Sequence, residues 1–347
     1  MSISFKEDHI SQIPALLMLE KLGYTYLTPD EALALRGGSV ANVVLESILR
    51  ERIAAINVVQ VSSTRTTVFS EQNITAGIEA LRNIPMDEGF MEASHTVYDL
   101  LTFGKTLEQI VDGDRKSFVM QYIDWKDIRN NVFHVTEEFA VSRTGMTDTY
   151  RPDIVLFVNG IPLCVIECKR PDVKDSIEQA ISQHLRNQKA DGIRSLYLYS
   201  TLLLAINRQE GSYATTATPE KFWARWREQF TDREEEARYR QELERVVNEP
   251  LLDDKLFGER FDYVHRNFED LYKQPVTPSV QDEYLYSLCR PERLLQLMYS
   301  FTLYDDGIKK VARYQQYFAV RQTMQRIRHI EGGRRRGGVI WHTQGSG

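Results

Sequence analysis

The sequence predicts a mixed α/β fold in which helices flank a central sheet. Two apolar runs, residues 154–158 and 163–166, are separated by Asn159-Gly160, a pair that favours a tight hairpin because both residues tolerate positive φ. Further along, residues 175–188 have the pattern of a helix and residues 195–206 are apolar enough for a buried strand. A strand, a helix and a second strand in this order usually form a parallel pair with a right-handed crossover, so we expect both strands in one sheet.

The composition is that of a globular protein with room for two domains. The chain has 347 residues, of which 42% are hydrophobic and 27% charged, and its net charge is −6. This charge argues against a protein that coats nucleic acid, although it permits a local basic groove. Cys164, Cys168 and Cys289 have no zinc spacing, so we interpret them as small buried side chains. No apolar run approaches the roughly 20 residues of a membrane helix, and we expect a cytoplasmic protein without a membrane partner.

The chain before the hairpin alternates between helical and extended segments. Apolar residues at helical spacing predict a helix over residues 13–22 that stops at Gly23, a suitable C-cap. Residues 24–27 follow as a short extended piece, and Pro29 with two acids opens another helix. The sequence then predicts helices over residues 43–57 and 74–81, an ambiguous segment over 89–104, and strands over 117–124 and 132–141.

Two acids and a lysine stand around the predicted hairpin. Asp153 precedes the first apolar run, and Glu167 and Lys169 follow the second. Residues two apart on a strand share a face, so Glu167 and Lys169 point the same way. A hard cation such as Mg²⁺, which prefers oxygen ligands, would gather the two carboxylates. The alternative is an ordinary surface Glu–Lys pair, which usually contributes little and leaves the apolar neighbours and the position of Asp153 unexplained.

These residues carry a resemblance. Asp-x13-Glu-x-Lys across a hairpin resembles the catalytic motif of the PD-(D/E)xK nuclease superfamily. The stretch RPDIVLFVNGIPLCVIECKRP, residues 151–171, closely resembles the corresponding segment of the restriction (motor) subunit of type I restriction enzymes, and IDWKDIRNNVFHVTEEF precedes it in the order found in that family. The resemblance implies that residues 1–255 form a PD-(D/E)xK endonuclease domain, with a mixed central sheet flanked by helices, that uses Mg²⁺ to hydrolyse DNA.

The resemblance also implies roles for individual residues. Mg²⁺ is expected to bind Asp153, Glu167 and the carbonyl of Cys168, to polarise the scissile phosphate and to lower the pKa of a bound water. Lys169 would orient or deprotonate that water, or neutralise the developing oxyanion.

A few further polar residues are also considered for the site. In many relatives a Gln-xxx-Tyr on the helix after the lysine helps to position the metal or the DNA. Gln183 is the best match here, with Asn187 in place of the tyrosine. The two lie on one helix face because they are four apart. Glu46 is either a solvated helix position or a carboxylate that faces the metal, and the solvated position is favoured. His134 is interpreted as a strand residue, because no second His or Cys stands at metal-binding spacing beside it.

The chemistry constrains the register of the hairpin. A regular two-residue turn at Asn159-Gly160 would place Asp153 opposite Ile166, and Glu167 would then lie on the other face of the sheet. A shared metal therefore requires an adjustment of one residue. We predict a wider loop or a β-bulge near residues 159–162, where a proline cannot donate to the ladder, or a bend at the start of the first strand.

Residues 256–347 are expected to contain a linker and the beginning of a first RecA-like motor lobe. Mixed charges over residues 228–249 predict a solvated helix before it, and apolar spacing predicts helices over 285–304 and 313–330. Between Arg321 and Gly337 there are six Arg and one Glu, a basic loop that is either a plain surface loop or a contact to a phosphate backbone.

The last residues resemble helicase motif I. A predicted buried strand, Val339 to Trp341, leads into the Gly345-Ser346-Gly347 loop, and such loops hold phosphates with backbone N–H groups. Upstream, Gln316 in YQQYF matches the adenine-reading glutamine of related helicases, with an exposed helix glutamine as an equal alternative. The resemblance thus implies an ATP site that uses Gln316 and residues 345–347, in a chain that is the N-terminal piece of a longer protein.

The function that the resemblance implies is cleavage of double-stranded DNA after ATP-driven translocation by the full-length motor subunit. Methyltransferase and specificity subunits of the type I complex would choose the site. Two alternatives remain open: a free-standing nuclease or junction resolvase of the same fold, and a catalytically inert assembly domain.

Overall fold

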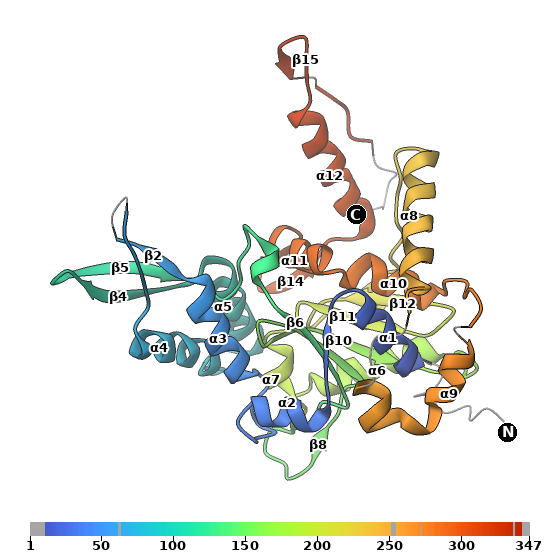
Figure 1. The fold of residues 1–347 in the computed structure, drawn as a ribbon, viewed down its shortest axis with the longest axis horizontal. Helices are drawn as coiled ribbons and strands as arrows, with labels where there is room; N and C mark the ends of the chain where they lie inside the picture. The colour runs from blue at the N-terminus through green and yellow to red at the C-terminus, as the bar shows by residue number, and fades with distance from the viewer. Residues whose placement is uncertain (1–10, 62–63, 251–254, 272, 336, 342–347) are drawn as a thin grey trace.

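A six-stranded sheet lies at the centre of the computed structural model, which describes residues 11–61, 64–250, 255–271, 273–335 and 337–341 (Figure 1). The strands, in spatial order, are β1 (Thr25–Leu27), β6 (Phe133–Glu137), β9 (Ile154–Val158), β10 (Ile161–Cys168), β11 (Leu202–Ile206) and β12 (Gly211–Ala214). β1 pairs with β6 and β10 with β11 in parallel, whereas the other neighbours are antiparallel. The predicted mixed sheet is therefore confirmed.

Helices cover both faces of this sheet. All residues of β9 and β10 are buried. α6 (Ser176–Asn187) packs on β10 and β11, on the face toward which Glu167 points. Successive side chains on a strand alternate between faces, so Cys168 points the other way, and its thiol is hydrogen-bonded by Ser11 next to α1 (Ile13–Lys21).

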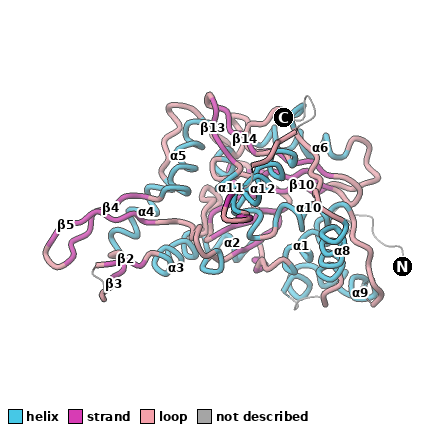
Figure 2. The backbone as a smooth tube through the Cα atoms, turned by 90° about the horizontal axis from the view of Figure 1, so that it is seen from above, coloured by secondary structure: helices cyan, strands magenta, loops and turns pink. Residues whose placement is uncertain are grey.

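A separate lobe is inserted between β1 and β6. It contains α3 (Glu46–Ile56), β2 (Val58–Gln60), β3 (Thr66–Val68), α4 (Glu71–Arg82), α5 (Phe90–Phe103), β4 (Lys105–Val111) and β5 (Asp114–Met120). β2 with β3 and β4 with β5 form two hairpins that extend away from the sheet, to the left in Figures 1 and 2. The ambiguous segment over residues 89–104 is thus a helix, and the strand predicted over 117–124 ends at Met120.

Shorter elements connect the sheet to the rest of the chain. α2 (Pro29–Leu35) starts as predicted, with the Thr28 side chain accepting from the Glu31 N–H in a capping box. The remaining pieces before β11 are η2 (Ile128–Asn130), β7 (Val141–Ser142), β8 (Thr149–Tyr150) and α7 (Arg194–Tyr197).

The strand predicted over residues 195–206 is wrong in its first half. Only Leu202–Ile206 forms β11, because the chain first makes α7 and a turn. Tyr197 is fully buried there, with its hydroxyl hydrogen-bonded to Nδ1 of His184 at 3.0 Å. An apolar run does not by itself distinguish a buried helix from a buried strand.

The C-terminal part is mainly helical and packs against the sheet layer. It contains η3 (Glu220–Phe222), α8 (Arg233–Val247), η4 (Leu256–Phe261), α9 (Asp262–Leu271), α10 (Val280–Cys289), α11 (Pro291–Ser300), β13 (Thr302–Asp305), β14 (Ile308–Val311), α12 (Tyr314–Arg328), β15 (Ile330–Glu331) and β16 (Arg334–Arg335). α10 contacts α1 and β12, and the Tyr284 hydroxyl donates to the Gly211 carbonyl at 2.5 Å. The domain boundary expected near residue 255 stays a prediction.

Two sequence predictions in this part are wrong. The helix expected over residues 285–304 is divided, because Pro291 cannot continue α10 and begins α11 instead. Residues 339–341 form no strand and are exposed, with Trp341 87% accessible. A strand needs hydrogen-bonding partners, and no strand in the described part of the chain pairs with this run.

Candidate functional site

The β9–β10 hairpin contains the predicted irregularity. Asn159 and Gly160 form a two-residue turn, with φ of 51° and 81°, and Val158 pairs with Ile161. The register shifts by one between Pro162 and Cys164, so Ile166 pairs with Ile154. Continuation of this register places Asp153 opposite Glu167 on one face of the sheet. The extra residue is Leu163, one position beyond the predicted segment.

Asp153 and Lys169 meet at the open end of this hairpin. Oδ2 of Asp153 accepts the N–H of Cys168 at 2.7 Å and lies 3.4 Å from Nζ of Lys169. Nζ of Lys169 also donates to the Cys168 carbonyl at 3.0 Å. The side chains of Asp153 and Lys169 are 17% and 14% exposed, so a small ligand can reach them while most of each group is shielded from water.

Glu167 lies beneath them and is fully buried. Its Oε2 accepts from Nε2 of Gln183 at 2.5 Å, and its Oε1 accepts from Nδ2 of Asn187 at 3.5 Å. Burial raises the pKa of Glu167 well above its usual range, and the nearby Asp153 carboxylate raises it further. Two carboxylates therefore face each other in a place where a negative charge is costly.

The donor set fits a hard divalent cation. It consists of the carboxylates of Asp153 and Glu167 and the carbonyl of Cys168, all oxygen ligands of the kind that Mg²⁺ takes. Within the described ranges no three His, Cys, Asp or Glu side chains gather in a metal-binding cluster. The protein would thus supply two carboxylates and one carbonyl as ligands, and waters would fill the other positions, since Mg²⁺ commonly keeps several waters.

α6 brings Gln183 and Asn187 to Glu167 rather than to Lys169. The helix begins after Asp175, which adopts the left-handed conformation with φ of 54°. Gln183 and Asn187 then point from one face of the helix at the same carboxylate. Asn187, which departs from the tyrosine that the resemblance led us to expect, thus reaches Glu167 through its amide.

Two residues near the site were missed by the sequence analysis. Nε2 of Gln12 donates to the carbonyl of Asp153 at 2.9 Å, and the N–H of Glu138 donates to the same carbonyl at 3.1 Å. Glu138 has a φ of 49°, an uncommon conformation for a residue with a side chain. No spacing pattern connects Gln12 with a residue so far along the chain, and Glu138 was assigned only to a strand.

Glu137 is a buried carboxylate at the same sheet edge that pairs with Arg260, whose side chain is 46% exposed. It ends β6 and is fully buried, and its Oε1 accepts from the Tyr26 hydroxyl at 3.0 Å. Nε of Arg260, on η4, donates to the same oxygen at 2.9 Å. The segment over residues 256–261 is thereby held beside the hairpin.

Two other candidates lie elsewhere. Glu46 pairs with Arg82 at 2.5 Å and with Arg50 at 3.7 Å in the inserted lobe, which agrees with the favoured interpretation of an ordinary helix position. His134 lies on β6 opposite Thr25, as a strand residue.

The residues assigned to ATP are only partly described. Gln316 lies in the first turn of α12, where its Oε1 accepts from the N–H of Arg313 at 2.9 Å, and it lines a cavity between α12 and the chain after β12. Gly345, Ser346 and Gly347 lie outside the described residues. The motif I assignment therefore stays a prediction.

Comparison with known families identifies the chain. A family model described as type I restriction enzyme R protein N terminus matches residues 4–222, which is more than half of the sequence. The chain belongs to this family. A second model, SWI2/SNF2 ATPase, matches the short stretch over residues 315–347, which includes Gln316 and the glycine-rich end.

Relatives of this R-protein family chain are known from archaea and bacteria. It is 26% identical to the MjaIXP type I restriction enzyme endonuclease subunit of Methanocaldococcus jannaschii, over 98% of this chain and 30% of that protein. It is 27% identical to the type I restriction enzyme HindI endonuclease subunit of Haemophilus influenzae, over 98% of this chain and 29% of that protein. The chain thus spans about three tenths of the length of these relatives. No helix among the described residues is both long and apolar enough to cross a bilayer.

Proposed function

We propose that this chain is the Mg²⁺-dependent endonuclease region of a type I restriction enzyme R protein and has a PD-(D/E)xK core. The observation that supports this most is the bulge at Leu163, which brings Asp153 opposite Glu167. A structural hairpin with this two-residue turn has no need of the bulge, whereas a shared cation requires it. The R-protein family match agrees with the proposal.

The chemistry follows from the positions of the side chains. Mg²⁺ bound by Asp153, Glu167 and the carbonyl of Cys168 would polarise the scissile phosphate and lower the pKa of a water. Lys169, whose Nζ already contacts Asp153 and the Cys168 carbonyl, is placed to donate to a phosphate oxygen as negative charge develops there. Gln183 orients Glu167 through the hydrogen bond to Oε2, as outer partners of metal ligands do.

The setting of the reaction is part of the proposal. The full-length protein would translocate duplex DNA with ATP through RecA-like lobes that begin after residue 255, and methyltransferase and specificity subunits would select the site. These steps are proposed for a full-length protein, because the chain spans only about three tenths of the length of its relatives. The proposal places the complex in the cytoplasm. A free-standing nuclease and an inert assembly domain are the alternatives that the experiment below separates from it.

Cleavage by the complete assembly tests the proposal. Asp153→Ala, Glu167→Ala and Lys169→Ala should each abolish cutting of duplex DNA in Mg²⁺ while ATP hydrolysis continues. Glu46→Ala serves as the control, because this carboxylate pairs with arginines in the inserted lobe. Wild-type cleavage in any of the three variants would remove that residue from the site. Cleavage without ATP or partner subunits would favour the free-standing nuclease, and an assembly of the wild-type protein that hydrolyses ATP and does not cut would favour the inert domain.

A further inference from the structure

Arg186 is an exposed arginine on α6 that lies beside the two amides holding Glu167. It follows Gln183 by three positions and precedes Asn187, and residues three or four apart share a helix face. Its Nε and Nη2 donate to Oδ1 of Asn187 at 3.4 and 3.1 Å, while Nδ2 of Asn187 donates to Glu167. The guanidinium is therefore two hydrogen bonds away from a carboxyl group of the candidate metal site.

Tyr150 holds the same guanidinium from the side of the hairpin. Cζ of Arg186 lies 4.6 Å from the centroid of the Tyr150 ring, a contact in which the ring attracts the cation. Tyr150 ends β8, three positions before Asp153. A planar guanidinium that is stacked on a ring and bonded to an amide is already oriented, so it loses little further freedom when it binds a ligand.

The charge of Arg186 has no ion-pair partner among the described residues. Arg143 is a direct comparison, because its Cζ lies 4.5 Å from the centroid of the same ring. Arg143 pairs with Asp148 at 3.0 Å and with Asp191 at 2.6 Å, so its charge is neutralised. Nη1 of Arg186, in contrast, makes no hydrogen bond within the described ranges and can offer two N–H groups to a ligand.

Glu167 does not neutralise Arg186 either. The positive charge of Arg186 lowers the pKa of Glu167, but burial and Asp153 raise this pKa by more, and it stays well above its usual range. Without a metal, Glu167 therefore holds a proton and carries little charge. With a divalent cation bound, the two charges of the cation offset those of Asp153 and Glu167. In both states the charge of Arg186 is left for another anion.

A phosphate of the DNA backbone has the chemistry that Arg186 can bind. Phosphate oxygens accept charge-assisted and often bidentate hydrogen bonds from a guanidinium. Phosphates follow one another on each strand at about 3.4 Å along the helix axis. A strand whose scissile phosphate lies on the metal therefore has neighbouring phosphates close to the site.

We propose that Arg186 binds a DNA phosphate beside the scissile one, and that Tyr150 and Asn187 hold its guanidinium in place for this contact. The inference rests on the proposed function, since it requires that duplex DNA reaches the metal site. Contacts of this kind position the backbone and do not read the sequence. Arg186 is thus a residue that binds and aligns the DNA for cleavage, whereas Gln183 orients a metal ligand.

DNA cleavage and ATP hydrolysis by the complete assembly on the same duplex, from about 50 to about 200 mM salt, test the inference. Arg186→Gln should lower the ratio of the cleavage rate to the ATP hydrolysis rate about tenfold or more at low salt. The logarithmic dependence of this ratio on salt should become shallower by about one unit, because one phosphate contact is lost. Arg186→Lys, which keeps the charge without the planar fork, should restore the salt dependence and part of the rate.

Two further variants complete the experiment. Tyr150→Leu should lower the ratio in the same direction and by a smaller factor, because the guanidinium loses its support and keeps its charge. Arg115→Gln is the matched control, since Arg115 lies on β5 in the inserted lobe and its side chain is 72% exposed. It should cut and respond to salt as wild type does. Equal melting temperatures of the two arginine variants show that folding is intact.

The outcomes separate this inference from the proposed function. Wild-type cleavage and salt dependence in Arg186→Gln would overturn the phosphate contact and leave the nuclease standing. Slower cleavage with an unchanged salt dependence would overturn it as well, because Arg186 would then act on Glu167 through Asn187.

A wild-type assembly that does not cut would refute the nuclease, and DNA binding would then decide the contact. The measurement is the fluorescence anisotropy of a short labelled duplex with the full-length protein. A Kd about tenfold higher in Arg186→Gln, with a shallower salt dependence, supports the phosphate contact. An equal Kd in both proteins, or no binding, overturns it.

Discussion

Replacing Glu167 with glutamine is expected to stabilise the metal-free protein. Glu167 is fully buried, and burial together with Asp153 raises its pKa. The folded chain therefore keeps a proton that the unfolded chain releases, so the free energy of unfolding falls as the pH rises from about 4.5 toward the raised pKa. Each unit of pKa difference corresponds to about 1.4 kcal/mol. Glutamine carries no charge, and Glu167→Gln should remove this decline.

The magnitude follows from the contacts of the carboxylate. Glutamine keeps an oxygen for the 2.5 Å hydrogen bond from Gln183 and loses the longer contact with Asn187 at 3.5 Å. The lost contact costs about 1 kcal/mol, whereas the substitution removes the desolvation penalty of a buried charged group, which is about 3 kcal/mol or more. The net gain at pH 8 is on the order of 2 kcal/mol, or about 4–8 °C in melting temperature.

Thermal denaturation in EDTA and then in Mg²⁺ measures both effects. The melting temperature of the wild type should fall between pH 5 and pH 8 in EDTA and rise when Mg²⁺ is added, by the equivalent of about 2.7 kcal/mol at a hundred times Kd. In Glu167→Gln the fall with pH should be smaller and Mg²⁺ should have no effect, and the control Glu46→Gln should behave as wild type. An identical pH profile and an identical response to Mg²⁺ in Glu167→Gln would refute the reasoning about this site.

Three other substitutions have expected outcomes. Gln183→Ala should slow DNA cleavage about tenfold or more and weaken the response to Mg²⁺, whereas the exposed Gln179→Ala should do neither; equal rates in both would contradict the orienting role. Arg260→Ala leaves the buried Glu137 without its ion-pair partner and should lower the free energy of unfolding, measured in urea, by about 2–4 kcal/mol. Adding Glu137→Gln should restore part of this stability, and an unchanged free energy of unfolding in Arg260→Ala would refute the role of the pair. Lys309→Met should stabilise the chain below pH 7 and abolish the rise in stability from pH 7 to 10. The reason is that burial lowers the pKa of Lys309 to about 7, so the folded state binds fewer protons than the unfolded state between pH 7 and 10. A pH profile of stability like that of the wild type would contradict this prediction.

The hairpin could be predicted in detail because chemistry and geometry constrain it together. Asn159-Gly160 specifies a two-residue turn, and a metal shared by Asp153 and Glu167 requires a shift of register. The turn and the shift are both present. Neither the turn nor the metal alone predicts the bulge, since the turn without the metal gives a regular ladder.

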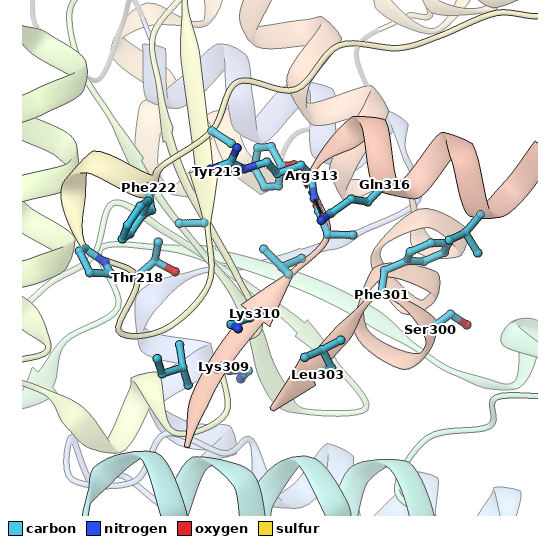
Figure 3. A pocket seen from close by; sticks show the side chains of 17 residues that line it. Tyr213, Thr218, Phe222, Ser300, Phe301, Leu303, Lys309, Lys310, Arg313 and Gln316 are labelled. Carbon is cyan, nitrogen blue, oxygen red and sulfur yellow. Dashed lines mark hydrogen bonds between the residues drawn. The ribbon is translucent and has the colours of Figure 1, made fainter. Parts of the chain in front are cut away.

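Other parts of the fold depend on contacts between distant residues that a sequence pattern does not contain. The run over residues 195–206 is buried along its whole length except at Ser195, so apolarity could not show where α7 ends and β11 begins. The contact of Gln12 with the Asp153 carbonyl joins two segments 141 residues apart. The cavity lined by residues 213–224 and 300–320 (Figure 3) likewise exists only because these two parts of the chain fold beside each other.

The bulge at Leu163 is required because the two acids are separated by an even number of positions in the sequence. In a hairpin closed by a two-residue turn, paired residues are always an odd number of positions apart, as Val158 and Ile161 are. Asp153 and Glu167 are an even number apart, so a single unpaired residue has to lie between them. A related hairpin with the same turn and an odd separation should have a regular ladder. One insertion or deletion in either strand would therefore separate the two acids without changing any residue of the site.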